Sequence, residues 1–439
     1  MLISIVRISA ILPGLSKEDD RKKSQAREKA YRKEYTRGSI LDREGRKICW
    51  SEKPMGDRRV IHPYAYSGLT GYWSVRYGTA GLEKTYDAYL TRSRSPKGKK
   101  TGASLTLTLD MNLQEEAWRQ IKDFEGSVVV LKVETGEILA IASSPSFNLE
   151  ELDDKWEEIC EEPGMLLPNA YRNPAAPGSV FKLVTSREIL EEGIDKEIVE
   201  DKGYLVVNGQ KIHNYNGTAH GSLSFSQAFV LSSNVYFMDR ALKMGPARLE
   251  ESAAAFLIGR EIPLDFTTLT SSFDMEDGSD NLLAVTAFGQ GNTLVTPLQM
   301  AMIGQSVAAD GIMMKPWLVQ SVKDGTGSDI LKGEAKVLTE TMRPETARKL
   351  RKAMKKAARH YGMRKVGSKG YDMGAKTGTA QRGDDTNNAW LVTMAPADKP
   401  EYVIVINRLH TSKIGKDLAP VAEDLYDLIF DKTEDSMER

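Results

Sequence analysis

Alternating and helix-like patterns of hydrophobic residues predict a mixed chain built around a β-sheet. Leucine alternates with threonine from Leu105 to Leu109, as in a strand with one buried face. Apolar runs at 128–133 and 138–142 flank Glu134-Thr-Gly-Glu137, and this pattern predicts a β-hairpin in a central sheet. The same kind of run predicts two more strands near the C-terminus, at 389–394 and 402–407.

Helical periodicity predicts the other main elements. Apolar residues at every fourth position from Leu113 to Ile121 predict a helix at 111–121. Ser224-Phe-Ser-Gln227 has the form of a capping box, so a helix should begin there and end at or near Ser232. Further helices are predicted at 179–193, 298–309, 344–361 and 417–430.

The predicted helix at 344–361 has a heavily basic side. Its basic residues are Arg348, Lys349, Arg351, Lys352, Lys355, Lys356 and Arg359. Such a side is usually a solvated surface over an ordinary core stripe, and contact with an anionic surface or polymer is the alternative.

These patterns divide the chain into three parts. We expect an N-terminal segment at 1–36, a small irregular module at 37–100 and a larger domain at 101–439, which follows a linker-like cluster of Pro, Gly and Lys at 95–102. The apolar run Met1–Leu12 is shorter than the ~20 residues of a membrane-spanning helix. We interpret it as a truncated anchor, a signal-like segment or a strand, followed by a charged tether.

Composition narrows the classes of function. With 439 residues, 41% of them hydrophobic, the chain can bury a full core. Its formal net charge of -1 gives no general attraction to nucleic acid, so no nucleic-acid partner is expected. Cys49, Cys160 and the scattered histidines lack the spacing of metal ligands, so we expect no metal and no other cofactor.

Ser179 and Lys182 are the first candidates for catalysis. They are three residues apart at the start of a helix-like run, so both would lie on one helix face with the amine near the hydroxyl. A serine with a base beside it is a candidate nucleophile, although a serine at this position, taken alone, is more often a helix N-cap. Two later motifs, Ser232-Ser-Asn234 and Lys376-Thr-Gly-Thr379, favour the catalytic interpretation.

The three motifs, in this order, resemble the set typical of penicillin-binding proteins and serine β-lactamases. Arg37-Gly-Ser-Ile-Leu-Asp-Arg-Glu-Gly45 resembles the start of the extracytoplasmic part of class B penicillin-binding proteins. Other segments that resemble their transpeptidase domains are 136–147, 288–291, 296–301 and 376–381. The resemblance covers most of the chain from residue 37. It implies an α+β penicillin-binding transpeptidase fold, with a central antiparallel sheet between helical layers and a small N-terminal module.

The resemblance also implies a peptidoglycan D,D-transpeptidase that β-lactams inhibit. Ser179 would attack a D-Ala-D-Ala peptide bond and release D-Ala, and an amine on a neighbouring stem peptide would resolve the acyl-enzyme. Lys182 would be the base if it is neutral, and Lys376 as a second cation favours that state. Ser232 would relay a proton, while Asn234 would bind the substrate backbone or fix Lys182.

The same resemblance assigns substrate binding to the predicted strand that begins near Lys376. Thr377 and Thr379 would hold the substrate's terminal carboxylate, with Gly378 between them, and the N–H groups of Ser179 and Thr379 would form an oxyanion hole. The expected partners are peptidoglycan stem peptides, β-lactam antibiotics and other cell-wall synthesis proteins such as a glycosyltransferase. The expected location is the extracytoplasmic face of the bacterial cell membrane.

Three rival functions would use similar motifs. A β-lactamase would need a base for deacylation, and no Glu-x-x-Leu-Asn segment is present. A D,D-carboxypeptidase would use the same site with water as the acceptor. A β-lactam sensor or scaffold would keep binding without turnover, although the intact motifs argue for retained chemistry.

Overall fold

The computed structural model describes residues 31–275 and 278–437 of the chain. The apolar run Met1–Leu12 and most of the predicted tether lie outside these residues. Within the described part of the chain, no helix is both long and apolar enough to cross a membrane.

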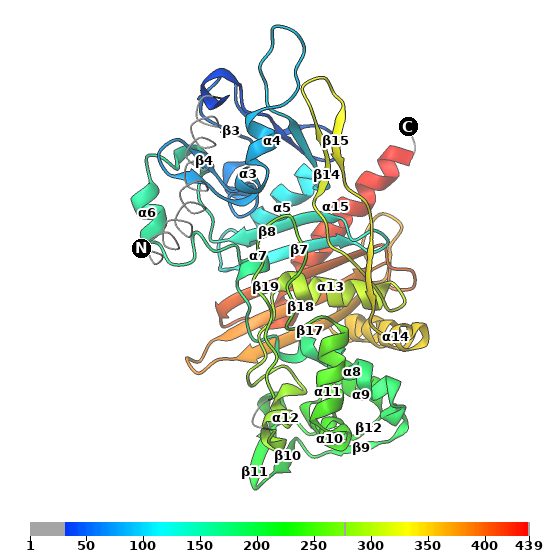
Figure 1. Ribbon diagram of the computed structural model, residues 1–439. Coiled ribbons are helices and arrows are strands. Elements are labelled where there is room, and N and C mark those ends of the chain that lie inside the picture. The colour runs from blue at the N-terminus through cyan, green and yellow to red at the C-terminus, as the bar shows by residue number, and fades with distance from the viewer. Residues whose placement is uncertain (1–30, 276–277, 438–439) are drawn as a thin grey trace, which may run out of the picture.

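A five-stranded antiparallel sheet occupies the middle of the molecule (Figure 1). Its strands, in spatial order, are β17 (Gly374–Gln381), β18 (Asn387–Ala395), β19 (Tyr402–Thr411), β7 (Gly126–Lys132) and β8 (Ile138–Ser144). Every neighbouring pair is antiparallel. The predicted hairpin and the two predicted C-terminal strands are therefore confirmed.

Both faces of this sheet are buried, which explains why its strands are continuous apolar runs. Val128 and Val130 belong to the core on one face, while Val129 and Leu131 belong to the core on the other. Side chains alternate between the faces of a strand, so a strand covered on both faces needs apolar residues at every position.

Helices cover the two faces. The helices α5 (Met111–Ile121) and α15 (Ala419–Met437) pack on the face that carries Val128. The other face is covered by α13 (Pro297–Ala308), which is buried along its whole length. The helix α14 (Pro344–His360) packs against α13 and β17. This arrangement confirms the predicted central antiparallel sheet between helical layers.

A second sheet lies above the central one in Figure 1 and joins three distant parts of the sequence. Its order is β15 (Asp329–Lys332), β14 (Val319–Lys323), β6 (Ser104–Leu107), β1 (Ile40–Leu41), β2 (Lys47–Trp50) and β3 (Arg59–Val60). The strand predicted from alternating leucines is β6, which pairs in parallel with β1. This sheet contains strands from both sides of the expected boundary at residue 100.

The remaining elements are short. Among the described residues, paired strands are β4 (Trp73–Ser74) with β5 (Gly78–Thr79), β9 (Val199–Asp201) with β12 (Gly221–Leu223), β10 (Tyr204–Val207) with β11 (Gln210–His213), and β13 (Ile312–Met314) with β16 (Val337–Glu340). Further α-helices are α2 (Pro63–Tyr66), α3 (Gly81–Thr85), α4 (Asp87–Thr91), α6 (Trp156–Glu161), α7 (Asn169–Arg172), α8 (Lys182–Glu191), α9 (Phe225–Leu231), α10 (Asn234–Met244), α11 (Pro246–Ala255) and α12 (Asp280–Thr286). The 3₁₀ turns include η2 (Gly178–Phe181) and η5 (Gly415–Leu418).

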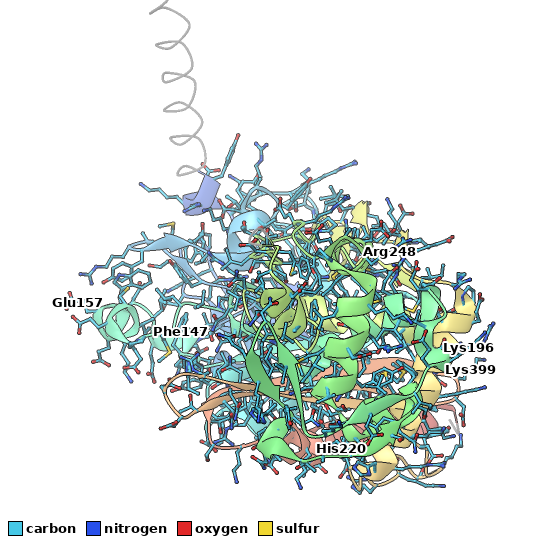
Figure 2. The ribbon with its side chains drawn as sticks, turned by 90° about the horizontal axis from the view of Figure 1, so that it is seen from below. Phe147, Glu157, Lys196, His220, Arg248 and Lys399 are labelled. Carbon is cyan, nitrogen blue, oxygen red and sulfur yellow. The ribbon has the colours of Figure 1, made fainter. Side chains whose placement is uncertain are left out.

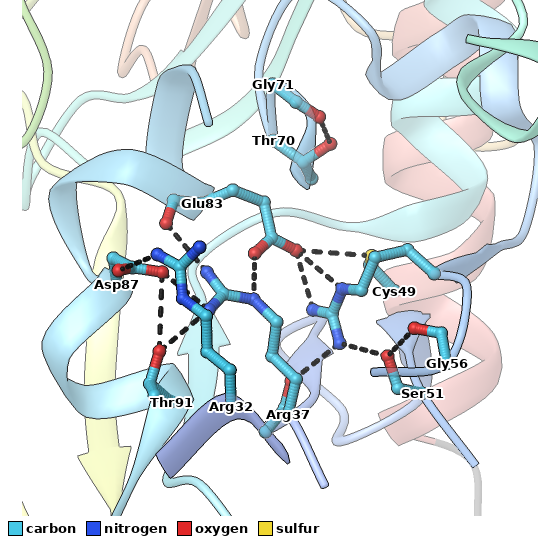
Figure 3. A network of polar contacts seen from close by, with 12 residues as sticks. Arg32, Arg37, Cys49, Ser51, Gly56, Thr70, Gly71, Glu83, Asp87 and Thr91 are labelled. Carbon is cyan, nitrogen blue, oxygen red and sulfur yellow. Dashed lines mark hydrogen bonds and ion pairs between the residues drawn. The ribbon is translucent and has the colours of Figure 1, made fainter. Parts of the chain in front are cut away.

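A buried charged cluster holds the N-terminal region together (Figure 3). Glu83, 1% exposed, accepts hydrogen bonds from Arg37 Nε at 2.6 Å and from Arg58 Nε at 2.8 Å. Arg37 also donates to Asp87 at 2.6 Å. Burial opposes ionisation of Glu83, but Arg37 and Arg58 outweigh it and hold the pKa of this carboxyl below its usual value. We call the three residues Arg37, Arg58 and Glu83 the N-terminal charge cluster.

Candidate active site

Ser179 lies in a tight turn that packs against the edge strand of the central sheet. This turn is η2, and the α-helix α8 begins only at Lys182, so the helix predicted from Ser179 starts with a 3₁₀ turn. Gly178 has φ +55°, and a Cβ there would lie 2.9 Å from the backbone N of Ala380 in β17. Only glycine fits at that contact, which brings Ser179 close to the strand.

The Ser232-Ser-Asn234 motif is the junction between α9 and α10. The predicted capping box at Ser224 is present at the start of α9. Ser232 ends this helix with φ +56°, a left-handed conformation that is uncommon for a residue other than glycine. Ser233 then caps α10 by accepting from Tyr236 N at 3.0 Å, and its hydroxyl donates to buried Asp201 at 2.6 Å. These contacts fix the turn that carries Ser232.

Two completely buried lysines meet at the hydroxyl of Ser232. Lys376 Nζ lies 2.9 Å from Ser232 Oγ and donates to the carbonyl of Thr377 at 3.0 Å. Lys182 Nζ lies 3.2 Å from the same oxygen. It also donates to the Ser232 carbonyl at 2.7 Å and to Asn234 Oδ1 at 2.8 Å. The structure thus brings the three sequence motifs into one site.

The environment of Lys182 favours its neutral form. Burial lowers the pKa of this amine well below its ordinary value, and the charge of Lys376 lowers it further. Asp201 acts in the opposite direction, but its carboxylate is engaged by Ser233 and by Asn214. A neutral amine beside a hydroxyl can accept a proton from it.

A cleft of about 750 Å³ opens over these groups. Of the predicted site residues, five line it: Ser179, Ser232, Asn234, Thr377 and Thr379. Lys182 and Lys376 are buried. Gly378 packs on the Ser179 turn, where a Cβ would lie 2.6 Å from the Pro177 carbonyl. Since β17 is an edge strand, one side of it is free to pair with an extended peptide.

Three residues of this site were missed in the sequence analysis: Tyr361, Asn214 and Asp201. Tyr361 follows α14 and its hydroxyl accepts from Lys376 Nζ at 3.3 Å. Asn214 receives hydrogen bonds from the backbone N–H groups of Asn234, at 2.7 Å, and Val235, at 3.0 Å, while its own amide donates to Asp201 at 2.8 Å. No local motif marks these positions, because each acts across a long sequence separation.

The histidines do not form a metal centre. His213 and His220 both line the cleft, but in the described part of the chain no group of three or more His, Cys, Asp or Glu side chains is placed to hold a metal ion.

Residues 126–427 match the family model of the penicillin-binding protein transpeptidase domain. The chain belongs to the penicillin-binding protein transpeptidase family. The match covers the central sheet, the Ser179 turn and the Ser232 turn. The predicted family, fold class and enzyme class are thereby confirmed.

Relatives and solved structures agree with this membership. Peptidoglycan D,D-transpeptidase PbpA of Mycolicibacterium smegmatis is 28% identical, over 82% of this chain and 82% of its own. The transpeptidase domain of a peptidoglycan glycosyltransferase from Eggerthella lenta is 29% identical, with a TM-score of 0.81 over 89% of this chain and 97% of its own. Penicillin-binding protein A from M. tuberculosis, solved as a penicillin G acyl-enzyme complex, is 26% identical, with a TM-score of 0.82 over 89% and 98%.

Proposed function

We propose that this transpeptidase cross-links peptidoglycan stem peptides and that Ser179 is its nucleophile. The observation that carries the assignment is the meeting of two buried lysines at Ser232 Oγ, below a cleft that Ser179 lines. A lysine whose pKa is lowered, one helical turn from a serine, is the base that such a hydroxyl needs.

The reaction proceeds in two acyl transfers. Neutral Lys182 accepts the proton of the Ser179 hydroxyl as Oγ bonds to the carbonyl carbon of the D-Ala-D-Ala peptide bond. The C–N bond then breaks, and the leaving D-Ala amine receives a proton relayed through Ser232, which contacts both lysines. An amine of a second stem peptide attacks the ester, forms the new peptide bond and releases Ser179 with its proton restored.

The strand β17 binds the substrate in this proposal. The hydroxyls of Thr377 and Thr379 hold the terminal carboxylate, and both residues line the cleft. The N–H groups of Ser179 and Thr379 stabilise the oxyanion, a contribution of about 3 kcal/mol for each donor. Asn234 accepts from Lys182 through Oδ1, which favours the role of fixing Lys182.

Labelling with a fluorescent penicillin tests the assignment of Ser179. Wild-type protein should gain one adduct, which peptide mass spectrometry places on Ser179, and Ser179→Ala should gain none. Ser222→Ala is the control, because Ser222 is an exposed serine that forms no part of the cleft, and it should label like the wild type. An adduct on another residue, or equal labelling of Ser179→Ala, contradicts the proposal.

The acceptor is tested separately. A D-Ala-D-Ala donor peptide is incubated with a D-amino acid, and products are separated by mass. Exchange of the terminal residue supports transfer to an amine, whereas release of D-Ala without exchange supports the D,D-carboxypeptidase alternative.

The proposed substrate also indicates where this protein acts and which proteins it contacts. Since peptidoglycan lies outside the cytoplasm, the site should face the extracytoplasmic side of the cell membrane. Other cell-wall synthesis proteins, such as a glycosyltransferase that extends the glycan strands, are the expected partners. Co-purification with crosslinking from intact cells checks that expectation.

A further inference from the structure

One wall of the cleft carries basic side chains from the β10–β11 hairpin. Lys211 and His213 belong to β11, and both line the cleft. The hairpin adjoins the Ser232 turn, since the His213 carbonyl accepts from Asn234 Nδ2 at 3.1 Å. Lys211 Nζ lies over the ring of Tyr204, 4.6 Å from its centroid, an arrangement that holds the ammonium in place.

A second part of the cleft lining carries Lys416 in η5. This residue lines the cleft beside Thr379, because the N–H of neighbouring Gly415 donates to Thr379 Oγ1 at 3.2 Å. Lys416 therefore lies on the side where the substrate's terminal carboxylate is proposed to bind. The two lysines thus belong to different parts of the lining, Lys211 near Asn234 and Lys416 near Thr379.

Lys211 and Lys416 differ in their surroundings from two lysines of α14. On α14, Lys349 pairs with Asp195 and Lys355 pairs with Asp372 and Asp398. Lys211 and Lys416 have no ion pair with any residue in the described part of the chain, and none of the described residues that line the cleft is an aspartate or glutamate. A cleft with cations in two parts of its lining and no counter-charge of its own favours a ligand with more than one negative group.

We propose that Lys211 binds a second carboxylate of the donor peptide, upstream of its D-Ala-D-Ala end. The preferred donor is then a stem peptide with a free carboxylate there rather than a carboxamide. This inference rests on the proposed function, because it takes the donor to be a stem peptide. With the terminal carboxylate on the Thr379 side, a peptide extended along β17 has its upstream residues free to reach the wall that carries Lys211.

Paired donor peptides test the proposal. One pair differs only by a carboxylate or carboxamide on a γ-linked glutamate upstream of D-Ala-D-Ala, and a second pair differs in the same way on the residue that precedes D-Ala-D-Ala. Binding to Ser179→Ala protein is measured by calorimetry, and D-Ala release by wild-type protein gives kcat/KM. In at least one pair, the carboxylate peptide should be favoured about threefold to fivefold, as expected for a partly exposed ion pair.

Variants of the two lysines separate their roles. Lys211→Gln should abolish the preference by weakening only the carboxylate peptide, Lys211→Glu should reverse it, and Lys211→Arg should restore it. Lys416→Gln should weaken both members of a pair equally. Lys399→Gln is the matched control, because Lys399 is an exposed lysine that lies away from cleft residue His220 (Figure 2), and it should change neither.

The outcomes distinguish the two proposals. Equal binding of both members in both pairs, or a preference that survives Lys211→Gln, overturns the second-carboxylate site. A uniform loss for all peptides in Lys211→Gln also overturns it. Failure of penicillin to label Ser179 contradicts the proposed function instead, and calorimetry still reads the carboxylate preference in that case.

Discussion

In the described part of the chain, two buried clusters of charged side chains differ in how their charges are paired. In the N-terminal charge cluster, Glu83 lies between Arg37 and Arg58, so each buried charge has a partner (Figure 3). In the candidate active site, Lys182 and Lys376 are both 0% exposed and share one hydroxyl, with the buried carboxylate of Asp201 behind the Ser232 turn. The first cluster pairs opposite charges, and the second brings like charges together.

This difference has an electrostatic consequence. The arginines lower the pKa of Glu83 despite its burial, so the carboxylate stays charged and the cluster acts as a stable crosslink. Burial and Lys376 both lower the pKa of Lys182, which favours the neutral amine that the proposed base requires. Two amines in one buried site reduce local stability, and the shifted pKa that results is typical of functional sites. The two clusters should therefore respond differently to mutation.

Replacing Lys182 should give the largest effect, and it should fall on activity. Lys182→Met removes the base, so the rate of acylation by penicillin should fall at least about 10³-fold. The free energy of unfolding should change little, because removing a buried amine relieves its desolvation and this offsets the lost hydrogen bonds to Ser232 and Asn234. Stopped-flow acylation and urea unfolding measure the two quantities. A folded variant that acylates at the wild-type rate would exclude Lys182 as the base.

The lowered pKa of Lys182 also predicts a pH dependence. The acylation rate of the wild type should rise as pH increases through this lowered pKa, because the neutral amine is the reactive form. The folded protein binds fewer protons than the unfolded chain between the lowered pKa and the ordinary lysine value of about 10.4. Stability from this group should therefore rise with pH across that window. A rate that rises only near the ordinary value would contradict the role of burial.

Replacing Glu83 should lower stability instead. The loss of unfolding free energy should be similar in size to the free-energy equivalent of the rate loss predicted for Lys182→Met. Glu83→Gln leaves two arginines without their carboxylate, which should lower the free energy of unfolding by about 3–5 kcal/mol. The control Glu116→Gln breaks a solvent-exposed pair with Arg119 and should lower the free energy of unfolding far less. Acylation by the folded fraction of either variant should equal that of the wild type. A similar midpoint for both variants in urea unfolding would show that burial gives the cluster no extra strength.

Glu83→Gln also tests how stability depends on pH on the acid side. Because the pKa of Glu83 is lowered, its contribution is complete above the ordinary carboxyl value of about 4.3 and is lost as pH falls toward the lowered pKa. Wild type and Glu83→Gln should therefore converge in stability at low pH. A stability difference between the two proteins that stays constant down to low pH would contradict this role of the Glu83 carboxylate.

Much of the central sheet could be predicted from sequence because both of its faces are buried. Continuous apolar runs at 128–133 and 402–407 and the capping box at Ser224 are local signals, and each fell where the structure has an element. The second sheet gave weaker signals, since β1 and β3 have two residues each and pair with strands distant in sequence. Pairing of that kind depends on tertiary contacts that periodicity does not encode.

The same contrast holds for the site. Ser179, Lys182 and Lys376 belong to short motifs with fixed spacing, so the sequence could name them as candidates that the structure brings into one site. Asp201 and Asn214 support the Ser232 turn from behind, and neither lies in a motif. Their roles depend on hydrogen bonds between segments that only the fold brings together.

Tyr361 gives the smallest predicted effect and tests how the lysine cluster is held. Its hydroxyl accepts from Lys376 Nζ at 3.3 Å, so Tyr361→Phe removes one of the contacts that orient this ammonium. Loss of one hydrogen bond of about 1 kcal/mol should slow acylation about fivefold while the urea midpoint stays unchanged. Tyr371→Phe is the control, because the Tyr371 ring packs against Phe430 with its centroid 4.8 Å away, and Tyr371 is not among the residues that line the cleft. If both variants acylate at the wild-type rate, Ser232 and Thr377 suffice to orient Lys376. A loss of stability in Tyr361→Phe would instead show that Tyr361, like the N-terminal charge cluster, supports the fold and not the reaction.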